Sequence, residues 1–426
     1  MRIAISVRVA LLLCFSAVSI GAWAQGEAFQ HGRVLVPDST IEHPEDVGRR
    51  AHTNHVIFLR SSGLKLTVPS GETPASLGCV YGLSSGATGC PKVNAAGPSR
   101  GSQTIAIVDA YHYASAYNDL TVFSNTFKLF VLPQCSATVT MGCFAQVFAK
   151  GSQPKTNCGW AQEAALDIEW AHAMAPNAKI VLVEAASNSN ADLFAAVDVA
   201  TNEVICGSRT CPYGTGEGEV SMSWGSSEFS SEKSFDSHFP VGNGVVYFAS
   251  SGDSGGKVIY PSASPYVVSA GGTTVNRSGG NFTTETAWSG SGGGPSKYEG
   301  RPTSGYQDVI QPIVGGSRGT PDFSFDANPS TGVSVYDSTS CQGLSGWLVF
   351  GGTSVSSPSL AGIVNLAGHF AIDSGTELGT IYADYSSSTY PKDYRDITSG
   401  TAGSFSAKAG WDFVTGVGSD IGTSGK

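Results

Sequence analysis

The sequence predicts an α/β fold, in which a parallel central sheet is covered by helices on both faces within a single large domain. Apolar runs recur along the chain with helical patterns between them, and glycine and serine follow several of the runs. The runs are "QTIAIVD" (103–109), "KIVLVEA" (179–185), "EVSMSW" (219–224), "GVVYFAS" (244–250) and "PYVVSAGG" (265–272). Helical patterns cover 159–175, 189–205 and 354–370. Strands that are apolar on both faces and alternate with helices are typical of a parallel sheet with two covered faces.

The N-terminus has the pattern of an export signal. Arg2 and Arg8 are followed by an apolar run that ends in Ala22-Trp23-Ala24. We predict a signal peptide over 1–24 and a secreted protein. The alternative is a membrane anchor, but the run is shorter than the ~20 residues that a spanning helix needs. Residues 25–66 are polar and are predicted to be a short propeptide or N-terminal extension rather than core, so the main domain covers 67–426.

Cysteine usage agrees with export. The chain has nine cysteines, and one of them, Cys14, lies in the predicted signal. An even number of remaining cysteines in an exported chain indicates disulfides. Short separations suggest the pairs Cys79–Cys90, Cys135–Cys143 and Cys206–Cys211, which leaves Cys158–Cys341 as the long-range pair.

Charge limits the classes of partner. Only 14% of residues are charged and the net charge is −10, against about 25% charged residues in typical soluble domains. A net negative chain is not expected to bind nucleic acid or an anionic membrane. Few ionic contacts are lost when carboxylates become protonated, so the surface suits acid. We expect a monomer.

Ser354 stands in the segment "GGTSVSSPSLAGIVNLAG" (351–368). Apolar residues at i, i+3, i+4 and i+7 predict a packed helix, and Pro358 is expected in its first turn. A hydroxyl at that position meets free backbone N–H groups and the positive end of a helix dipole. Ser354 is therefore either a helix cap or a nucleophile, and the segment alone leaves both open.

The helix predicted over 159–175 carries two carboxylates on one face. Glu163 and Asp167 are four residues apart, and Trp170 falls on the same side, whereas His172 points to the opposite side. Two close carboxylates share a proton and give a base that works in acid. The alternative is a solvated face, which the absence of a basic residue at i±4 disfavours.

Asp253 follows a predicted buried strand in "SSGDSGG" (250–256). It is either a turn residue or a protonated carboxyl that donates a hydrogen bond to a developing oxyanion. The second function also requires acid.

These segments together resemble the sedolisin family, the serine-carboxyl peptidases with a subtilisin-like fold that act at low pH. "GGTSVSSP" is similar to the family's nucleophile segment, "EAALD" to its Glu-x-x-x-Asp helix, and "SSGDSG" to its oxyanion segment. The resemblance covers about 70–420. It implies a peptidase that acts on protein or peptide substrates through an acyl-enzyme.

The resemblance also implies roles for individual residues. Ser354 would be the nucleophile, Glu163 its general base, Asp167 the partner that tunes Glu163, and Asp253 an oxyanion donor beside the Ser354 N–H. Ser223, Trp224 and Gly225, in "MSWG", would pair with the peptide as an added strand.

A calcium site is implied at the C-terminus, in "DIT" (396–398) and "KAGWDFVTGVGS" (408–419). Oxygen ligands from two carboxylates and three backbone carbonyls suit one calcium ion. The ligands would be Asp396, Ile397, Lys408, Gly410 and Asp412.

The chain departs from the family in its short pro-region and in Asp109, which ends the first core strand where subtilisins keep an aspartate. Asp109 would either extend the carboxylate network or cap the strand. The alternatives to an acid peptidase are a conventional subtilisin that uses Asp109 with His172 or His112, and a non-catalytic peptide-binding relic. An acid pH optimum favours carboxylates, whereas an optimum above 7 favours histidine.

Overall fold

The structure is a computed structural model that describes residues 32–60, 66–93, 96–136, 139, 142–205 and 214–426. The predicted signal peptide and the predicted pair Cys206–Cys211 lie outside the described residues. Within the described part, no helix is both long and apolar enough to cross a bilayer. The other three predicted disulfides, Cys79–Cys90, Cys135–Cys143 and Cys158–Cys341, are confirmed.

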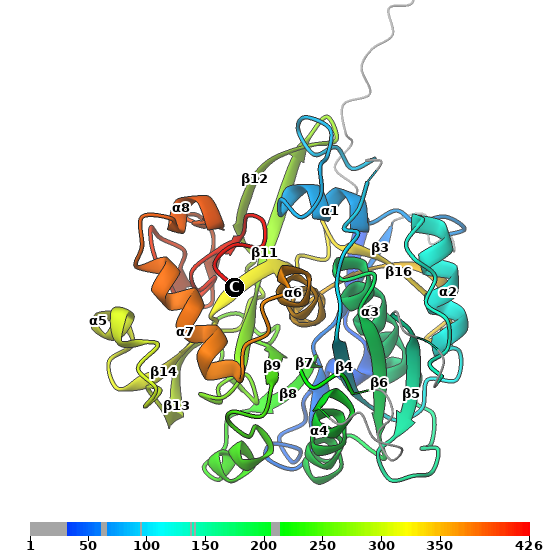
Figure 1. Cartoon of the computed structure of the whole chain (residues 1–426), viewed down its shortest axis with the longest axis horizontal. Helices are drawn as coiled ribbons and strands as arrows, with labels where there is room; N and C mark the ends of the chain where they lie inside the picture. Colours follow the sequence, from blue (N-terminus) through cyan, green and yellow to red (C-terminus); the bar gives the residue numbers. More distant parts are fainter. Residues whose placement is uncertain (1–31, 61–65, 94–95, 137–138, 140–141, 206–213) are drawn as a thin grey trace, which may run out of the picture.

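A large sheet forms the centre of the molecule (Figure 1). Its strand order is β18-β21-β15-β11-β9-β7-β4-β6-β5, and every neighbouring pair from β21 to β5 is parallel. The strands are β4 (Thr104–Ala110), β5 (Phe144–Phe148), β6 (Lys179–Ala185), β7 (Gly218–Met222), β9 (Val245–Ser250), β11 (Val268–Ser278), β15 (Phe323–Asp326), β18 (Tyr394–Arg395) and β21 (Ser419–Asp420), with β12 (Asn281–Ala287) paired to β11. Each of the five predicted apolar runs contributes a strand, and the predicted fold class is confirmed.

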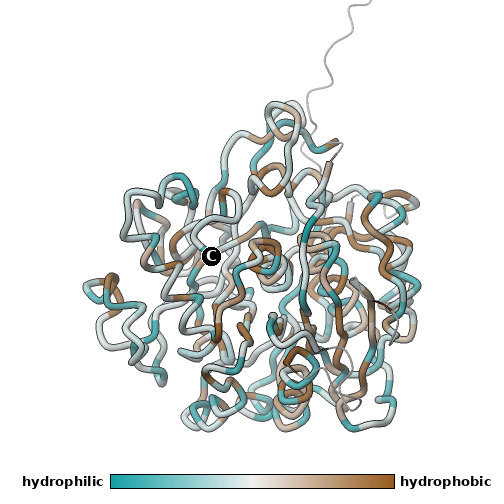
Figure 2. The backbone as a smooth tube through the Cα atoms, in the orientation of Figure 1, coloured by the Kyte–Doolittle hydropathy of each residue, from teal (hydrophilic) through white to brown (hydrophobic). Residues whose placement is uncertain are grey.

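Helices cover both faces of this sheet. The three predicted helices are α3 (Cys158–Met174), α4 (Asn190–Ile205) and α6 (Thr353–Ala367). Alternate residues of β4 join different hydrophobic clusters: Ile105 and Ile107 pack in the cluster with α3 and α6, whereas Ala106 and Val108 pack in the cluster with α4. This alternation places α3 and α6 together on one face and α4 on the other. Figure 2 shows hydrophobic segments in these strands and helices, while many outer loops are hydrophilic or neutral.

Shorter elements complete the domain. The remaining helices are α1 (Pro74–Val80), α2 (Ala116–Phe127), α5 (Gln311–Val314), α7 (Ser374–Tyr385), α8 (Tyr390–Asp393) and the 3₁₀ segments η1 (Asp38–Thr40), η2 (Glu232–His238) and η3 (Asp308–Ile310). The remaining strands away from the N-terminus are β8 (Trp224–Ser227), β10 (Ile259–Tyr260), β13 (Gly294–Gly300), β14 (Ser317–Thr320), β16 (Val333–Cys341), β17 (Leu344–Gly351), β19 (Thr401–Ala402) and β20 (Phe405–Ser406).

The N-terminal segment is part of the core. Strands β1 (Gly32–Leu35) and β3 (Val56–Arg60) join β17 and β16 in an antiparallel sheet, and β2 (His52–Thr53) pairs with β8. Ile57 is fully buried in the main hydrophobic cluster. The expectation that 25–66 lies outside the core is therefore wrong, because 51–60 supplies backbone partners and apolar side chains to the domain. Whether the segment is later removed stays a prediction.

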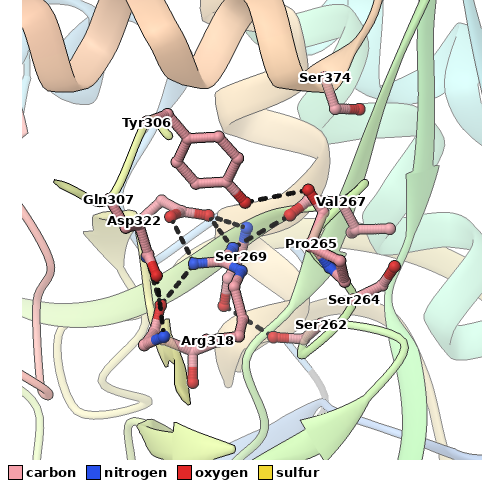
Figure 3. A network of polar contacts seen from close by, with 12 residues as sticks. Ser262, Ser264, Pro265, Val267, Ser269, Tyr306, Gln307, Arg318, Asp322 and Ser374 are labelled. Carbon is pink, nitrogen blue, oxygen red and sulfur yellow. Dashed lines mark hydrogen bonds and ion pairs between the residues drawn. The ribbon is translucent and has the colours of Figure 1, made fainter. Parts of the chain in front are cut away.

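A buried ion pair fixes the loops on the α7 side of the sheet (Figure 3). Arg318 donates to both oxygens of Asp322, and Asp322 also accepts from the backbone N–H of Ser269 and from the hydroxyl of Tyr382. Arg318 and Asp322 are fully buried. A buried ion pair satisfied in this way gives the loop before β15 one fixed position.

Candidate active site

Ser354 is the second residue of α6. Gly352 caps the helix with φ +99°, and a Cβ at this position would lie 2.5 Å from Asp253 Oδ2. Only glycine fits, because both the left-handed backbone and the close approach exclude a side chain. The prediction that Ser354 lies at the helix start is confirmed, and its backbone N–H donates outside the helix, to the carbonyl of Asn54.

Pro358 lies beyond the first turn that the sequence suggested. It is the sixth residue of α6 and has no N–H with which to bond the carbonyl of Ser354, four residues earlier. That carbonyl instead accepts a hydrogen bond from the Ser223 hydroxyl at 3.3 Å, and the Ser354 hydroxyl donates to the Ser223 carbonyl at 3.2 Å. Because Pro358 leaves the Ser354 carbonyl without a helical partner, this carbonyl can bond to Ser223, in the loop between β7 and β8.

Helix α3 brings its carboxyl groups into the interior. Asn157 caps the helix by accepting from the N–H groups of Gly159 and Trp160. The helix packs on the sheet beside α6 (Figure 1), and Glu163 and Asp167 are fully buried. The alternative of a solvated face is therefore wrong. Burial raises the pKa of Glu163 well above its usual range, while the Ser354 hydroxyl acts in the opposite direction.

The buried carboxyl groups raise one another's pKa. Burial raises the pKa of Asp167 well above its usual range, and the charge of Glu163 raises it further. Burial also raises the pKa of Asp109, at the end of β4, and Asp167 and Glu163 add to that rise. Three close carboxyls cannot all ionise together, so the charge of one favours the protonated form of the others. Asp109 thus belongs to the same electrostatic cluster, as one of the two predicted alternatives requires.

Asp253 follows β9 and faces the first turn of α6. Its Oδ1 accepts from the N–H of Thr353 at 2.7 Å and from the Thr353 hydroxyl at 2.9 Å. Its Oδ2 has no hydrogen-bond partner among the described residues. Burial raises the pKa of Asp253 to about 7, although Thr353 and the imidazole of His55 oppose the rise. Below that pH the carboxyl holds a proton that Oδ2 can donate.

Asn54 and His55 lie in the middle of this group, and no motif in the sequence marks either residue. The N–H of Ser354 donates to the Asn54 carbonyl at 3.0 Å, and His55 Nδ1 lies 2.7 Å from Glu163 Oε2. Both residues are fully buried. The signal that could have placed them is the apolar run 56–59 directly after them, which is typical of a strand and not of an extension.

Ser223, Trp224 and Gly225 line the same site with their backbone. Trp224 and Gly225 pair with Thr53 and His52 across β8 and β2. The Trp224 indole points away from this strand pair and donates to the carbonyl of Val108 at 2.8 Å. The three residues therefore hold an extended segment of the same chain, residues 52–54, through main-chain contacts.

The histidines of the alternative triad lie elsewhere. His112 contacts Glu184 at 2.8 Å and His172 is fully buried on α3. Burial lowers the pKa of both His172 and His55 to about 4. Among the described residues, no histidine hydrogen-bonds to the Ser354 hydroxyl, whose partner is the Ser223 carbonyl. Neither His112 nor His172 is therefore placed as a base for Ser354.

The predicted calcium ligands gather at one corner near α8. Asp396 Oδ2 accepts from the N–H of Gly410 and Asp412 Oδ2 from the N–H of Lys408, each at 3.0 Å. Among the described residues, no backbone N–H outside the helices and strands donates to the carbonyl oxygens of Ile397, Lys408 and Gly410. Two carboxylates with three available carbonyls form a donor set that fits calcium. No group of three or more acidic, histidine or cysteine side chains that could hold a metal ion occurs in the described part of the chain.

Known proteins resemble the chain in sequence, although no family model matches it. Kumamolisin from Bacillus sp. (strain MN-32) is 31% identical over 294 residues, which cover 61% of this chain and 49% of kumamolisin. Sedolisin from Pseudomonas sp. (strain 101) is 34% identical over 178 residues, which cover 38% of this chain and 28% of sedolisin. The chain thus spans half or less of the length of these curated relatives.

A solved structure agrees with the fold. Pseudomonas sedolisin, a serine-carboxyl proteinase in complex with two molecules of pseudo-iodotyrostatin, matches with a TM-score of 0.64 and 23% identity. The match covers 83% of this chain and 96% of that structure. In sequence the chain is thus similar to kumamolisin and sedolisin, and its fold is that of the Pseudomonas serine-carboxyl proteinase.

Proposed function

We propose that the protein is a secreted, acid-acting serine-carboxyl peptidase that hydrolyses peptide bonds through an acyl-enzyme on Ser354. The observation that carries this proposal is the convergence of Ser354, the carboxyl cluster of α3 and Asp253 around one peptide carbonyl, that of Asn54. The substrates are proteins or peptides that lie along β8 as an added strand.

Each residue has one role in the proposed reaction. Glu163 takes the proton of the Ser354 hydroxyl as that oxygen attacks the substrate carbonyl. Asp167, which shares protons with Glu163, sets the pH at which Glu163 can act as a base. The Ser354 N–H and the protonated Asp253 donate hydrogen bonds to the oxyanion. Glu163 then returns the proton to the leaving amine.

Replacing the nucleophile tests the proposal. Ser354→Ala is expected to lower digestion of an unfolded protein such as casein at pH 3–5 by at least about 10⁴-fold, because no other group forms the acyl bond. Ser356→Ala, also at the start of α6, removes a bond to the Phe325 carbonyl and serves as the matched control. Equal activity of Ser354→Ala and the wild type would refute the mechanism.

Calcium at the C-terminal corner is part of the proposal. Asp396 and Asp412 with the carbonyls of Ile397, Lys408 and Gly410 would hold one ion, which would brace the loop before β21. Saturating calcium is expected to raise the free energy of unfolding by about 3 kcal/mol at a hundredfold excess over Kd. Thermal melts with calcium and with a chelator measure this, with Asp412→Asn as the variant that loses the effect. Identical melts with and without calcium would contradict it.

A further inference from the structure

We propose that the protein cleaves its own chain between Asn54 and His55, and that its acyl-side pocket is built to accept asparagine. The inference rests on the proposed peptidase function and adds to it the bond cut and the side chain recognised. The proposed cut differs from the boundary near residue 67 that the sequence predicts between the N-terminal extension and the main domain. The reason is that residues 52–55, and not those near 67, lie beside Ser354.

The segment 52–55 lies in the site as an extended peptide. Strand β2 runs antiparallel to β8, with His52 opposite Gly225 and Thr53 opposite Trp224. The N–H of Asn54 then donates to the Ser223 carbonyl at 3.2 Å, which continues the ladder by one residue. This main-chain register is the one that any extended peptide would take on β8.

The carbonyl of Asn54 is held where an oxyanion would form. It accepts from the Ser354 N–H at 3.0 Å. A Cβ added to Gly352 would lie 2.2 Å from the Asn54 carbonyl oxygen and 2.5 Å from Asp253 Oδ2. Both oxygens therefore lie next to the Cα of Gly352. Two donors, one backbone and one carboxyl, therefore flank the Asn54 carbonyl and not those of Thr53 or His55. The bond that follows this carbonyl is Asn54–His55.

The side chain of Asn54 occupies a specific pocket. Its Nδ2 donates to the Ser250 hydroxyl at 2.7 Å, at the end of β9. Both residues are fully buried. Asn54 Oδ1 has no hydrogen-bond partner among the described residues, so recognition rests on the bond from Nδ2. An apolar side chain here would leave the Ser250 hydroxyl without this partner.

The reaction balances with water as the second reactant. The Ser354 oxygen bonds to the Asn54 carbonyl carbon, the bond from that carbon to the His55 nitrogen breaks, and the Ser354 proton passes through Glu163 to that nitrogen. Water then hydrolyses the ester, which leaves a carboxylate on Asn54 and restores the Ser354 hydroxyl.

Both products remain attached to the domain. His55 would become the N-terminus of β3, which pairs with β17 through Ile57 and Val56. The piece that ends at Asn54 stays paired through β1 with β3, while its β2 end must leave β8 before another peptide can lie there. The cut is therefore expected to appear only after denaturation, with the two pieces copurifying under native conditions.

Intact-mass spectrometry and N-terminal sequencing of the full chain, denatured after incubation at pH 4, test the inference. We expect a piece that begins at His55 from the wild type and none from Ser354→Ala. Asn54→Ala is expected to slow the cut about five- to tenfold, the effect of one lost hydrogen bond in a buried site. Asn202→Ala, exposed on α4, is the matched control and should cleave at the wild-type rate.

Casein digestion in the same samples separates the two proposals. The inference is overturned if a chain that is intact at Asn54–His55 digests casein. It is also overturned if the active chain has its new N-terminus near residue 67. Both outcomes leave the peptidase function standing. A chain that cuts neither casein nor itself overturns both. The same cut in Ser354→Ala would assign it to another protease and also overturn the inference.

Discussion

Glu163→Gln is expected to lower kcat at pH 4 by about 10³-fold, within the 10²–10⁴-fold range of general acid–base catalysis. The amide has nearly the same shape as the protonated carboxyl but cannot take a proton from Ser354. KM should change little, because substrate is held by the backbone of β8. Steady-state kinetics of the processed enzyme on a short peptide measures both constants.

The same helix offers a matched control for this substitution. Glu169 is also buried on α3, and its Oε2 accepts from the N–H of Tyr336 at 3.0 Å, away from Ser354. Glu169→Gln should therefore keep kcat near the wild-type value while imposing the same change in charge. Equal losses in both variants would show that Glu163→Gln acts through stability and not through the base.

Asp253→Ala is expected to lower kcat/KM by about 10²–10³-fold, the effect of removing one oxyanion donor. Asp253→Asn should recover part of the loss, since its amide can donate where Oδ2 stands while its oxygen still accepts from Thr353. The wild type loses this donor as pH rises through the pKa of about 7 that burial gives Asp253. The asparagine has no such proton, so its activity should no longer fall over that range.

Peptide kinetics of the three proteins between pH 3 and pH 8 measure this effect. The comparison of alanine with asparagine separates the hydrogen bond from the charge. An Asp253→Asn profile that falls in the same way as the wild type would assign the fall to another group.

Local patterns predicted the helices and the main strands because each has a clear period. Glu163 and Asp167 lie four residues apart on a helix, so their shared face follows from helical geometry alone. The start of α6 at Ser354 follows in the same way from its glycines and apolar stripe.

Contacts between distant segments could not be predicted in this way. Strand β2 has two residues, too few to show a period, and its place is set by pairing with β8, some 170 residues later. The depth of Glu163 also depends on segments packed around α3, which is why a solvated face stayed open. Asn54 and His55 acquire their surroundings only in the folded chain.

The pH dependence of kcat/KM for the processed wild-type enzyme tests the central claim, that carboxyl groups and not an imidazole activate Ser354. We expect kcat/KM to decline as pH rises through about 7, where Asp253 loses its proton. An imidazole base would give the opposite sign, with activity lost below about pH 6 as the ring becomes protonated. Activity that rises between pH 5 and pH 8 and is retained above it would contradict the account.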